Sequence, residues 1–131
     1  MKVMCFGSFD IFHKGHEDYF KQAKQFGDYL VVVVSRDHNF RRIKNREPLN
    51  SEVVRLKKVS DYKLVDKAVF GHEKDLFSII VEEKPRVICL GYDQWANELK
   101  LKNELLKRGL NVKILRAKPF KPEKYKSSKL S

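Results

Sequence analysis

The stretch Phe6-Gly7-Ser8-Phe9-Asp10-Ile11-Phe12-His13-Lys14-Gly15-His16 joins an apolar run to the first segment with helical periodicity. At such a strand-to-helix junction, an α/β protein offers the unpaired N–H groups and the positive dipole end of the helix to an anion. His13 and His16 are three residues apart, so both imidazoles can project from one face of the helix start. Gly7 and Gly15 leave room for phosphate oxygens to approach the backbone. The stretch therefore predicts a phosphate-binding site at the end of the first strand.

Short apolar runs rich in β-branched residues alternate with segments of helical periodicity along most of the chain. This rhythm is typical of βαβ units and of a parallel sheet whose two faces are covered by helices. The predicted strands are Lys2–Phe6, Tyr29–Val34, Val65–Phe70, Arg86–Leu90 and Asn111–Leu115. The predicted helices are Gly15–Phe26, a segment from an N-cap at Asn50 or Ser51 through Val59, Asp75–Glu83 and Trp95–Arg108. We therefore expect an α/β fold with a five-stranded parallel sheet flanked by four helices.

The length of 131 residues favours one domain that spans residues 1–131. Hydrophobic residues make up 42% of the chain, which is enough for a core. The longest purely apolar run, Leu30–Val34, is far shorter than the ~18 residues that span a bilayer, so neither a membrane span nor a secretory signal is expected. Cys5 and Cys89 lie in predicted buried strands, as core thiols of a reducing compartment do. We therefore expect a cytoplasmic protein.

The 28 lysine and arginine residues exceed the 17 aspartate and glutamate residues, and the net charge of +11 favours anionic partners. Two segments concentrate this charge. Residues 36–46 contain five basic residues and one acid, and we expect them to form a long basic loop. Residues 117–131 form a second, lysine-rich segment, which we expect to be mobile and to become ordered when an anion binds. Charge alone does not choose between phosphorylated metabolites, nucleic acid and lipid headgroups.

A zinc site at His13 and His16 is a weaker interpretation than a phosphate site. Zinc needs three or four protein ligands, and no further cysteine, histidine or acid is suitably spaced nearby. Capping and packing are the default roles of a lone histidine such as His38 or His72. At His13 and His16, by contrast, the strand, the Gly-Ser turn and the paired histidines all favour phosphate binding. We therefore predict a phosphate site and no metal ligands.

Gly7-Ser8-Phe9-Asp10 followed by His13-x-Gly15-His16 resembles the signature of the cytidylyltransferase-like nucleotidyltransferases. The resemblance implies a Rossmann-like nucleotidyltransferase fold, in which the HxGH segment binds the triphosphate of ATP or CTP and the second histidine stabilises charge as pyrophosphate leaves. It extends along the chain to other segments. They are Lys44 and Arg55 as basic residues for phosphates, Val65-Asp66 as a strand start, Gly91-Tyr92-Asp93-Gln94 as a nucleotide loop, and Tyr125-Lys126-Ser127-Ser128-Lys129 as a shortened C-terminal phosphate motif.

The Gly-Tyr-Asp-Gln loop and the closing Ser-Ser-Lys are similar to those of the archaeal FAD synthases, which transfer AMP from ATP to FMN. Glycerol-phosphate cytidylyltransferases are similar in size. Their loop reads Gly-Asp-Asp-Trp and their C-terminal motif is the longer Arg-Thr-Glu-Gly-Ile-Ser-Thr-Thr, and this chain has neither. The similarity therefore implies ATP and FMN as substrates, with CTP and glycerol 3-phosphate as the alternative pair.

The implied reaction is in-line attack by a phosphate oxygen of the acceptor on the α-phosphorus of the nucleotide, without a covalent enzyme intermediate. The resemblance implies that His16, His13 and Lys14 are catalytic and that Lys44 and Arg55 contact the triphosphate or the acceptor phosphate. The implied nucleotide-binding residues are Gly7, Ser8, Phe9, His13, Lys14, Gly15, His16, Gly91, Asp93, Ser127 and Ser128. Mg²⁺ is expected to be carried mainly by the substrate phosphates. The sequence leaves the oligomeric state open, with a homodimer as one candidate because dimers are common among similar proteins.

A small basic nucleic-acid-binding protein is the alternative from another class of function. The net charge, the basic loop and the lysine-rich segment are all suited to contacts with a phosphate backbone. Nucleic-acid binding, however, gives no reason for two histidines around a glycine at a helix start. We therefore prefer the enzyme.

Overall fold

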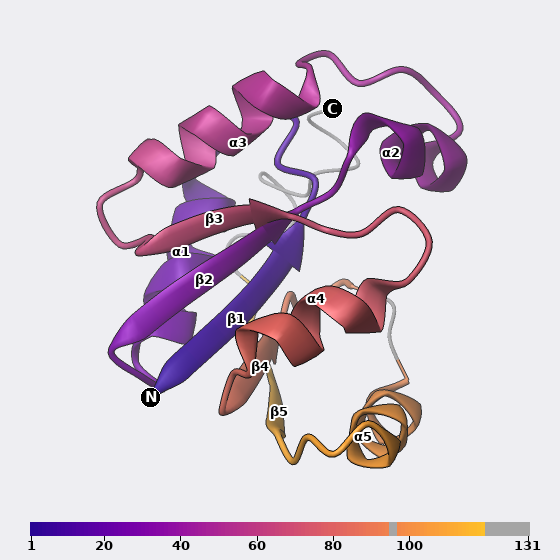
Figure 1. Cartoon of the computed structure of the whole chain (residues 1–131). Helices are drawn as coiled ribbons and strands as arrows, with labels where there is room; N and C mark the ends of the chain where they lie inside the picture. Colours follow the sequence, from indigo (N-terminus) through magenta and orange to yellow (C-terminus); the bar gives the residue numbers. More distant parts are fainter. Residues whose placement is uncertain (95–96, 120–131) are drawn as a thin grey trace.

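The computed structural model describes residues 1–94 and 97–119, which form a five-stranded parallel sheet with helices on both faces (Figure 1). The strands are β1 (Lys2–Gly7), β2 (Tyr29–Val34), β3 (Lys67–Phe70), β4 (Val87–Leu90) and β5 (Lys113–Arg116). Their order in the sheet is β3-β2-β1-β4-β5, and every neighbouring pair is parallel. The expected Rossmann-like arrangement is confirmed.

Helices cover the two faces of the sheet because successive residues of a strand point to opposite sides. The helices are α1 (Lys14–Lys24), α2 (Asp37–Lys44), α3 (Glu52–Asp61), α4 (Leu76–Glu83) and α5 (Glu98–Lys107). On one face, Cys5 of β1 belongs to a core with Phe20 of α1 and Val59 of α3. On the other face, the adjacent Met4 belongs to a core with Ile80 of α4. A three-layer structure results, with β1 at its centre.

Helix α2 corrects our expectation of a long basic loop at residues 36–46. The helix has Asp37 in its first turn and basic residues in its last turn, which suits the helix dipole. It ends at Asn45, which adopts the left-handed conformation with φ of 56°. Phe40 is the one buried residue of this helix, so the segment lacks the repeated apolar stripe by which a sequence reveals a helix. The described residues therefore contain five helices rather than four.

The ends of the other helices agree with the predicted ones to within a few residues. Ser51 caps α3, as predicted, by accepting a hydrogen bond from a backbone N–H. Helix α5 begins later than predicted, with Asn97 as its N-cap. The predicted helix start at Trp95 and the motif that contains Ser127 and Ser128 lie outside the described residues. None of the helices in the described part of the chain is long and apolar enough to cross a membrane.

The carboxyl end of β1 lies where the winding of the chain reverses, because the sheet continues through β2 on one side of β1 and through β4 on the other. Open α/β sheets bind ligands in the crevice outside such a switch point. The β1–α1 loop and the loop after β4 both begin there, so two sequence motifs far apart in the chain meet at one edge of the sheet (Figure 1).

Candidate active site

The loop after β1 folds back on itself through Phe9. This residue adopts a left-handed conformation with φ of 53°, and its buried ring lies over Gly7. A Cβ atom at Gly7 would lie 2.6 Å from the Phe9 ring, which leaves no room for a side chain there. The ring also makes an edge contact with His16, at 5.0 Å between centroids. Gly7 and Phe9 were both predicted to bind the nucleotide. In the structure the absence of a side chain at Gly7 makes room for the ring of Phe9, and this ring packs against His16.

His13 and His16 cap α1 reciprocally. The Nδ1 atom of His13 accepts a hydrogen bond from the N–H of Gly15 at 3.0 Å, and the Nδ1 atom of His16 accepts from the N–H of His13 at 3.3 Å. This is a capping box in which two imidazoles take the places usually held by a hydroxyl and a carboxylate or amide. The rings stack with their centroids 3.8 Å apart. Because both Nδ1 atoms accept, each neutral ring carries its proton on Nε2, as an N–H donor.

The surroundings of the two histidines keep both rings neutral. Burial, the neighbouring His13 and the charge of Lys44 together lower the pKa of His16 to about 3. Burial also lowers the pKa of His13, and the charge of Asp93 opposes this effect. At neutral pH the two rings therefore act as hydrogen-bond donors rather than as cations. The same interactions place Lys44 within electrostatic range of His16, and Asp93 within range of His13, as the sequence predicted for one site.

The remaining predicted basic residues lie around this pair. Lys14, the first residue of α1, is exposed beside the two histidines in the chain. On α2, Arg41 donates a hydrogen bond to Glu47 at 2.6 Å, so it is engaged within the protein. Lys44 is exposed near the end of the same helix. Because Lys44 belongs to a helix, its backbone is held in a fixed place near His16, which a free loop would not achieve.

Asp10 lies at the site, although no role was predicted for it from the sequence. Its carboxylate is buried and accepts hydrogen bonds from the N–H groups of Leu49 and Asn50, at 2.9 and 2.8 Å. Arg46 lies 3.5 Å from the same carboxylate. These contacts fasten the segment between α2 and α3 to the β1–α1 loop. A lone acid in an otherwise neutral and basic motif was the signal available in the sequence.

Arg55 of α3 has no exposed surface, although the family resemblance implied that it contacts phosphates. Its guanidinium donates to the carbonyl oxygens of Ser8, Ser35 and Asn50, at 2.8, 2.8 and 3.1 Å. It also pairs with Asp37 at 2.7 Å. Burial alone would raise the pKa of Asp37, and the contacts with Arg55 and nearby groups hold it below its usual value. In this structure Arg55 binds the loops around the site to one another.

The turn after β4 is the part of the site that faces α1 across the switch point. The N–H of Gln94 donates to the carbonyl oxygen of Gly91 at 3.2 Å and closes the turn. Arg116 of β5 donates to the carbonyl oxygens of both residues, at 3.1 Å to Gly91 and 2.7 Å to Gln94. The predicted nucleotide loop is thus a braced turn, and Asp93 lies within it.

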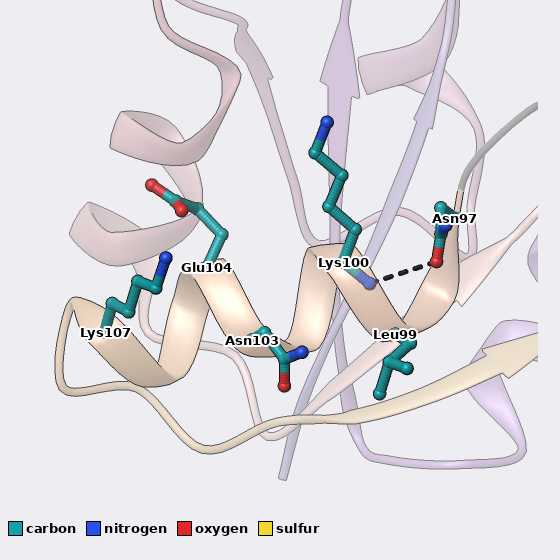
Figure 2. A pocket seen from close by; sticks show the side chains of 6 residues that line it. All are labelled: Asn97, Leu99, Lys100, Asn103, Glu104 and Lys107. Carbon is teal, nitrogen blue, oxygen red and sulfur yellow. Dashed lines mark hydrogen bonds between the residues drawn. The ribbon is translucent and has the colours of Figure 1, made fainter.

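A separate hollow of about 320 Å³ lies along α5 (Figure 2). Asn97, Leu99, Lys100, Asn103, Glu104 and Lys107 line it. All six belong to this one helix or its N-cap, and the hydrogen bond drawn between them is the cap itself, from the N–H of Lys100 to Asn97 at 3.1 Å. The hollow takes no residue from the β1–α1 loop or from the turn after β4, so it is separate from the predicted nucleotide site.

A parallel sheet of order 3-2-1-4-5 with a histidine-capped helix at its switch point defines a nucleotide-binding α/β protein. The sequence model described as Cytidylyltransferase-like matches residues 4–130. The chain therefore belongs to the cytidylyltransferase-like family.

Similar proteins narrow the comparison within this family. A FAD synthase of Archaeoglobus profundus is 44% identical over 98% of this chain and 81% of its own length. A FAD synthase of Korarchaeum cryptofilum is 49% identical over 91% of this chain and 82% of its own length. A crystal structure from Thermoplasma volcanium, described as a lipopolysaccharide core biosynthesis protein, superimposes with a TM-score of 0.87 at 43% identity. It covers 92% of this chain and 98% of the solved chain.

Proposed function

We propose that this protein is an FMN adenylyltransferase, which transfers AMP from ATP to FMN and releases pyrophosphate. A phosphate oxygen of FMN attacks the α-phosphorus of ATP, the new oxygen–phosphorus bond forms, and the bond from the α-phosphorus to the bridging oxygen of the β-phosphate breaks. FAD and pyrophosphate result. The observation that carries the proposal is the reciprocal histidine cap, which presents two neutral Nε2–H donors at a helix N-terminus.

The two donors serve the charge that develops on the triphosphate. A neutral imidazole N–H, already oriented by its cap, stabilises the leaving pyrophosphate without having to reorganise. His16 fills this role and His13 holds the phosphates. Lys14 and Lys44 add positive charge, and the free N–H groups of α1 add the helix dipole. No nucleophilic side chain is needed, because the acceptor supplies the attacking oxygen.

Mg²⁺ would reach this site bound to the substrate phosphates rather than to protein ligands. The N–H and ammonium groups at the start of α1 bind phosphate oxygens and are not metal ligands, and among the described residues no group of three or more His, Cys, Asp or Glu is placed to hold a metal ion. When bound to the substrate phosphates, the ion supplies charge neutralisation at the reacting phosphates. The chain's own residues orient those phosphates.

The preference for ATP and FMN over CTP and an alcohol phosphate rests on the FAD synthases that this chain matches over most of their length. Gly91 and Asp93 are assigned to the nucleoside, and Ser127 and Ser128 to its phosphates. A cytoplasmic location and a homodimer complete the proposal. The location is supported by two buried free cysteines, which suit a reducing compartment.

The test is product formation by the purified chain with Mg²⁺, given ATP plus FMN or CTP plus glycerol 3-phosphate, with pyrophosphate and nucleotide product both quantified. FAD from the first mixture alone supports the proposal. CDP-glycerol from the second alone replaces it with the cytidylyltransferase alternative. His16→Ala is the informative variant, because alanine removes the Nε2–H donor on which the proposed role depends. We expect a loss of about 10²–10³-fold in turnover, and a variant within twofold of the unmutated chain would refute the role of His16.

A further inference from the structure

Strands β1 and β4 separate before they reach the site. The ladder between them joins Val3 to Val87 and Met4 to Ile88. On its other side β1 pairs with β2 along its whole length, as far as Gly7. The carboxyl ends of β1 and β4 therefore need partners other than each other for their backbone groups.

Side chains supply these partners. The hydroxyl of Tyr19 accepts a hydrogen bond from the N–H of Phe6 at 3.3 Å and donates to the carbonyl oxygen of Cys89. One step nearer the site, the amide of Gln94 forms a second bridge. Its Oε1 accepts from the N–H of Gly91 at 2.8 Å, and its Nε2 donates to the carbonyl oxygen of Phe6. Gln94 thus joins the two strand ends where the ladder has stopped.

The bridge depends on the close packing of Gln94 against Gly91. A Cβ atom at Gly91 would come within 3.2 Å of the side-chain carbons of Gln94, so the two residues already lie in close contact. The bridge needs an acceptor for the N–H of Gly91 and a donor to the carbonyl oxygen of Phe6. The glutamine amide supplies both at the end of one side chain. Because Asp93 precedes Gln94 in the chain, the same bridge sets the place of its carboxylate relative to α1.

We propose that Gln94 is a positioning residue, which by joining Gly91 to Phe6 holds the turn that contains Asp93 against the end of β1 and so fixes the separation between the nucleotide turn and the histidine pair. The inference rests on the proposed function only for its effect on activity. The positioning role itself does not depend on the substrate, because the bridge from Gly91 to Phe6 is present without one. Arg116 braces the turn from β5, so the turn keeps an attachment when Gln94 is replaced.

The experiment measures the effect of Asp93 on His13 by NMR titration of the histidine ring in the full chain. In the unmutated background, Asp93→Asn should lower the pKa of His13, because a negative charge that favours the imidazolium is removed. In the Gln94→Met background, which has similar bulk and no hydrogen-bonding amide, the same change should lower the pKa of His13 by a smaller amount. Gln25→Met, an identical replacement at an exposed position, should leave the effect of Asp93→Asn intact. Equal shifts in the unmutated and Gln94→Met backgrounds would overturn the proposal.

A second variant serves if Gln94→Met does not fold. Gln94→Glu keeps the acceptor for the N–H of Gly91 and loses the donor to Phe6, so the effect of Asp93→Asn on His13 should shrink. An undiminished effect would overturn the proposal. In the adenylyl-transfer assay, Gln94→Met should raise the KM for ATP more than it lowers kcat. If the unmutated chain forms no FAD, the proposed function fails, while the histidine titration still decides the role of Gln94.

Discussion

Acidification should destabilise the folded protein through His16 well before its carboxylates are protonated. The ordinary pKa of a histidine is 6.5, and in the folded chain the pKa of His16 is lowered to about 3. Below pH 6.5 the unfolded chain therefore binds a proton that the folded chain does not bind until the pH falls to about 3. The stability that His16 provides is fully present above pH 6.5 and is lost as the pH falls towards 3.

The size of the effect follows from the two pKa values. Each pH unit below 6.5 costs about 1.4 kcal/mol for one proton, so at about pH 5 the loss is about 2 kcal/mol. The assay is urea unfolding at about pH 7.5 and about pH 5, with the free energy of unfolding obtained from each curve. His16→Gln is measured in parallel, because it retains the cap and removes the titrating ring. The variant should lose about 2 kcal/mol less than the unmutated chain between the two pH values.

The comparison isolates His16 from other titrating groups, since those are present in both proteins. The pKa of His13 is also lowered, so His13 reduces the free energy of unfolding on acidification in both proteins. If the two proteins lose the same free energy of unfolding on acidification, His16 is not held neutral by its surroundings. The assignment of an Nε2–H donor to a permanently neutral ring would then be wrong.

Three further changes test other parts of the site. Lys44→Met should raise the pKa of His16, because a like charge is removed, and should raise the KM for ATP; an unchanged histidine titration would separate Lys44 from the site. Arg55→Met should lower the free energy of unfolding by about 3 kcal/mol, since it leaves a half-buried carboxylate and three carbonyl groups without their donor, and a loss below 1 kcal/mol by urea unfolding would contradict this. Gly7→Ala should cost about 1–3 kcal/mol in the same assay because its Cβ meets the ring of Phe9 at 2.6 Å, whereas a neutral result would mean that the ring moves freely.

The sheet was predictable because each strand is a short apolar run, rich in β-branched residues, that can be recognised in the local sequence. Tyr29–Val34 is an apolar run that contains four consecutive valines, and its predicted bounds are those of β2. Helix α2 was missed because it buries Phe40 alone, and three of its other seven residues are arginine or lysine, which is typical of a solvated loop. Its dipole and its cap stabilise the helix without leaving an apolar period in the sequence.

The candidate site was predictable in its position and less so in its internal contacts. The spacing of His13 and His16 placed both rings at one helix start, and the structure brings them together there. Capping by the two histidines was the alternative set aside in favour of phosphate binding, and the structure shows that both rings do cap α1. Arg55 was assigned to phosphates from the family resemblance, whereas its burial depends on four segments that converge in three dimensions.

The single guanidinium of Arg55 has a consequence for how this protein can diverge. It connects the turn after β1, the turn after β2, the first turn of α2 and the approach to α3. A change in the length of any one of these connections would have to be accommodated by the other three at once. Changes in specificity around this site should therefore arise by exchange of exposed side chains with loop lengths kept, and an engineered library should vary such side chains rather than graft loops.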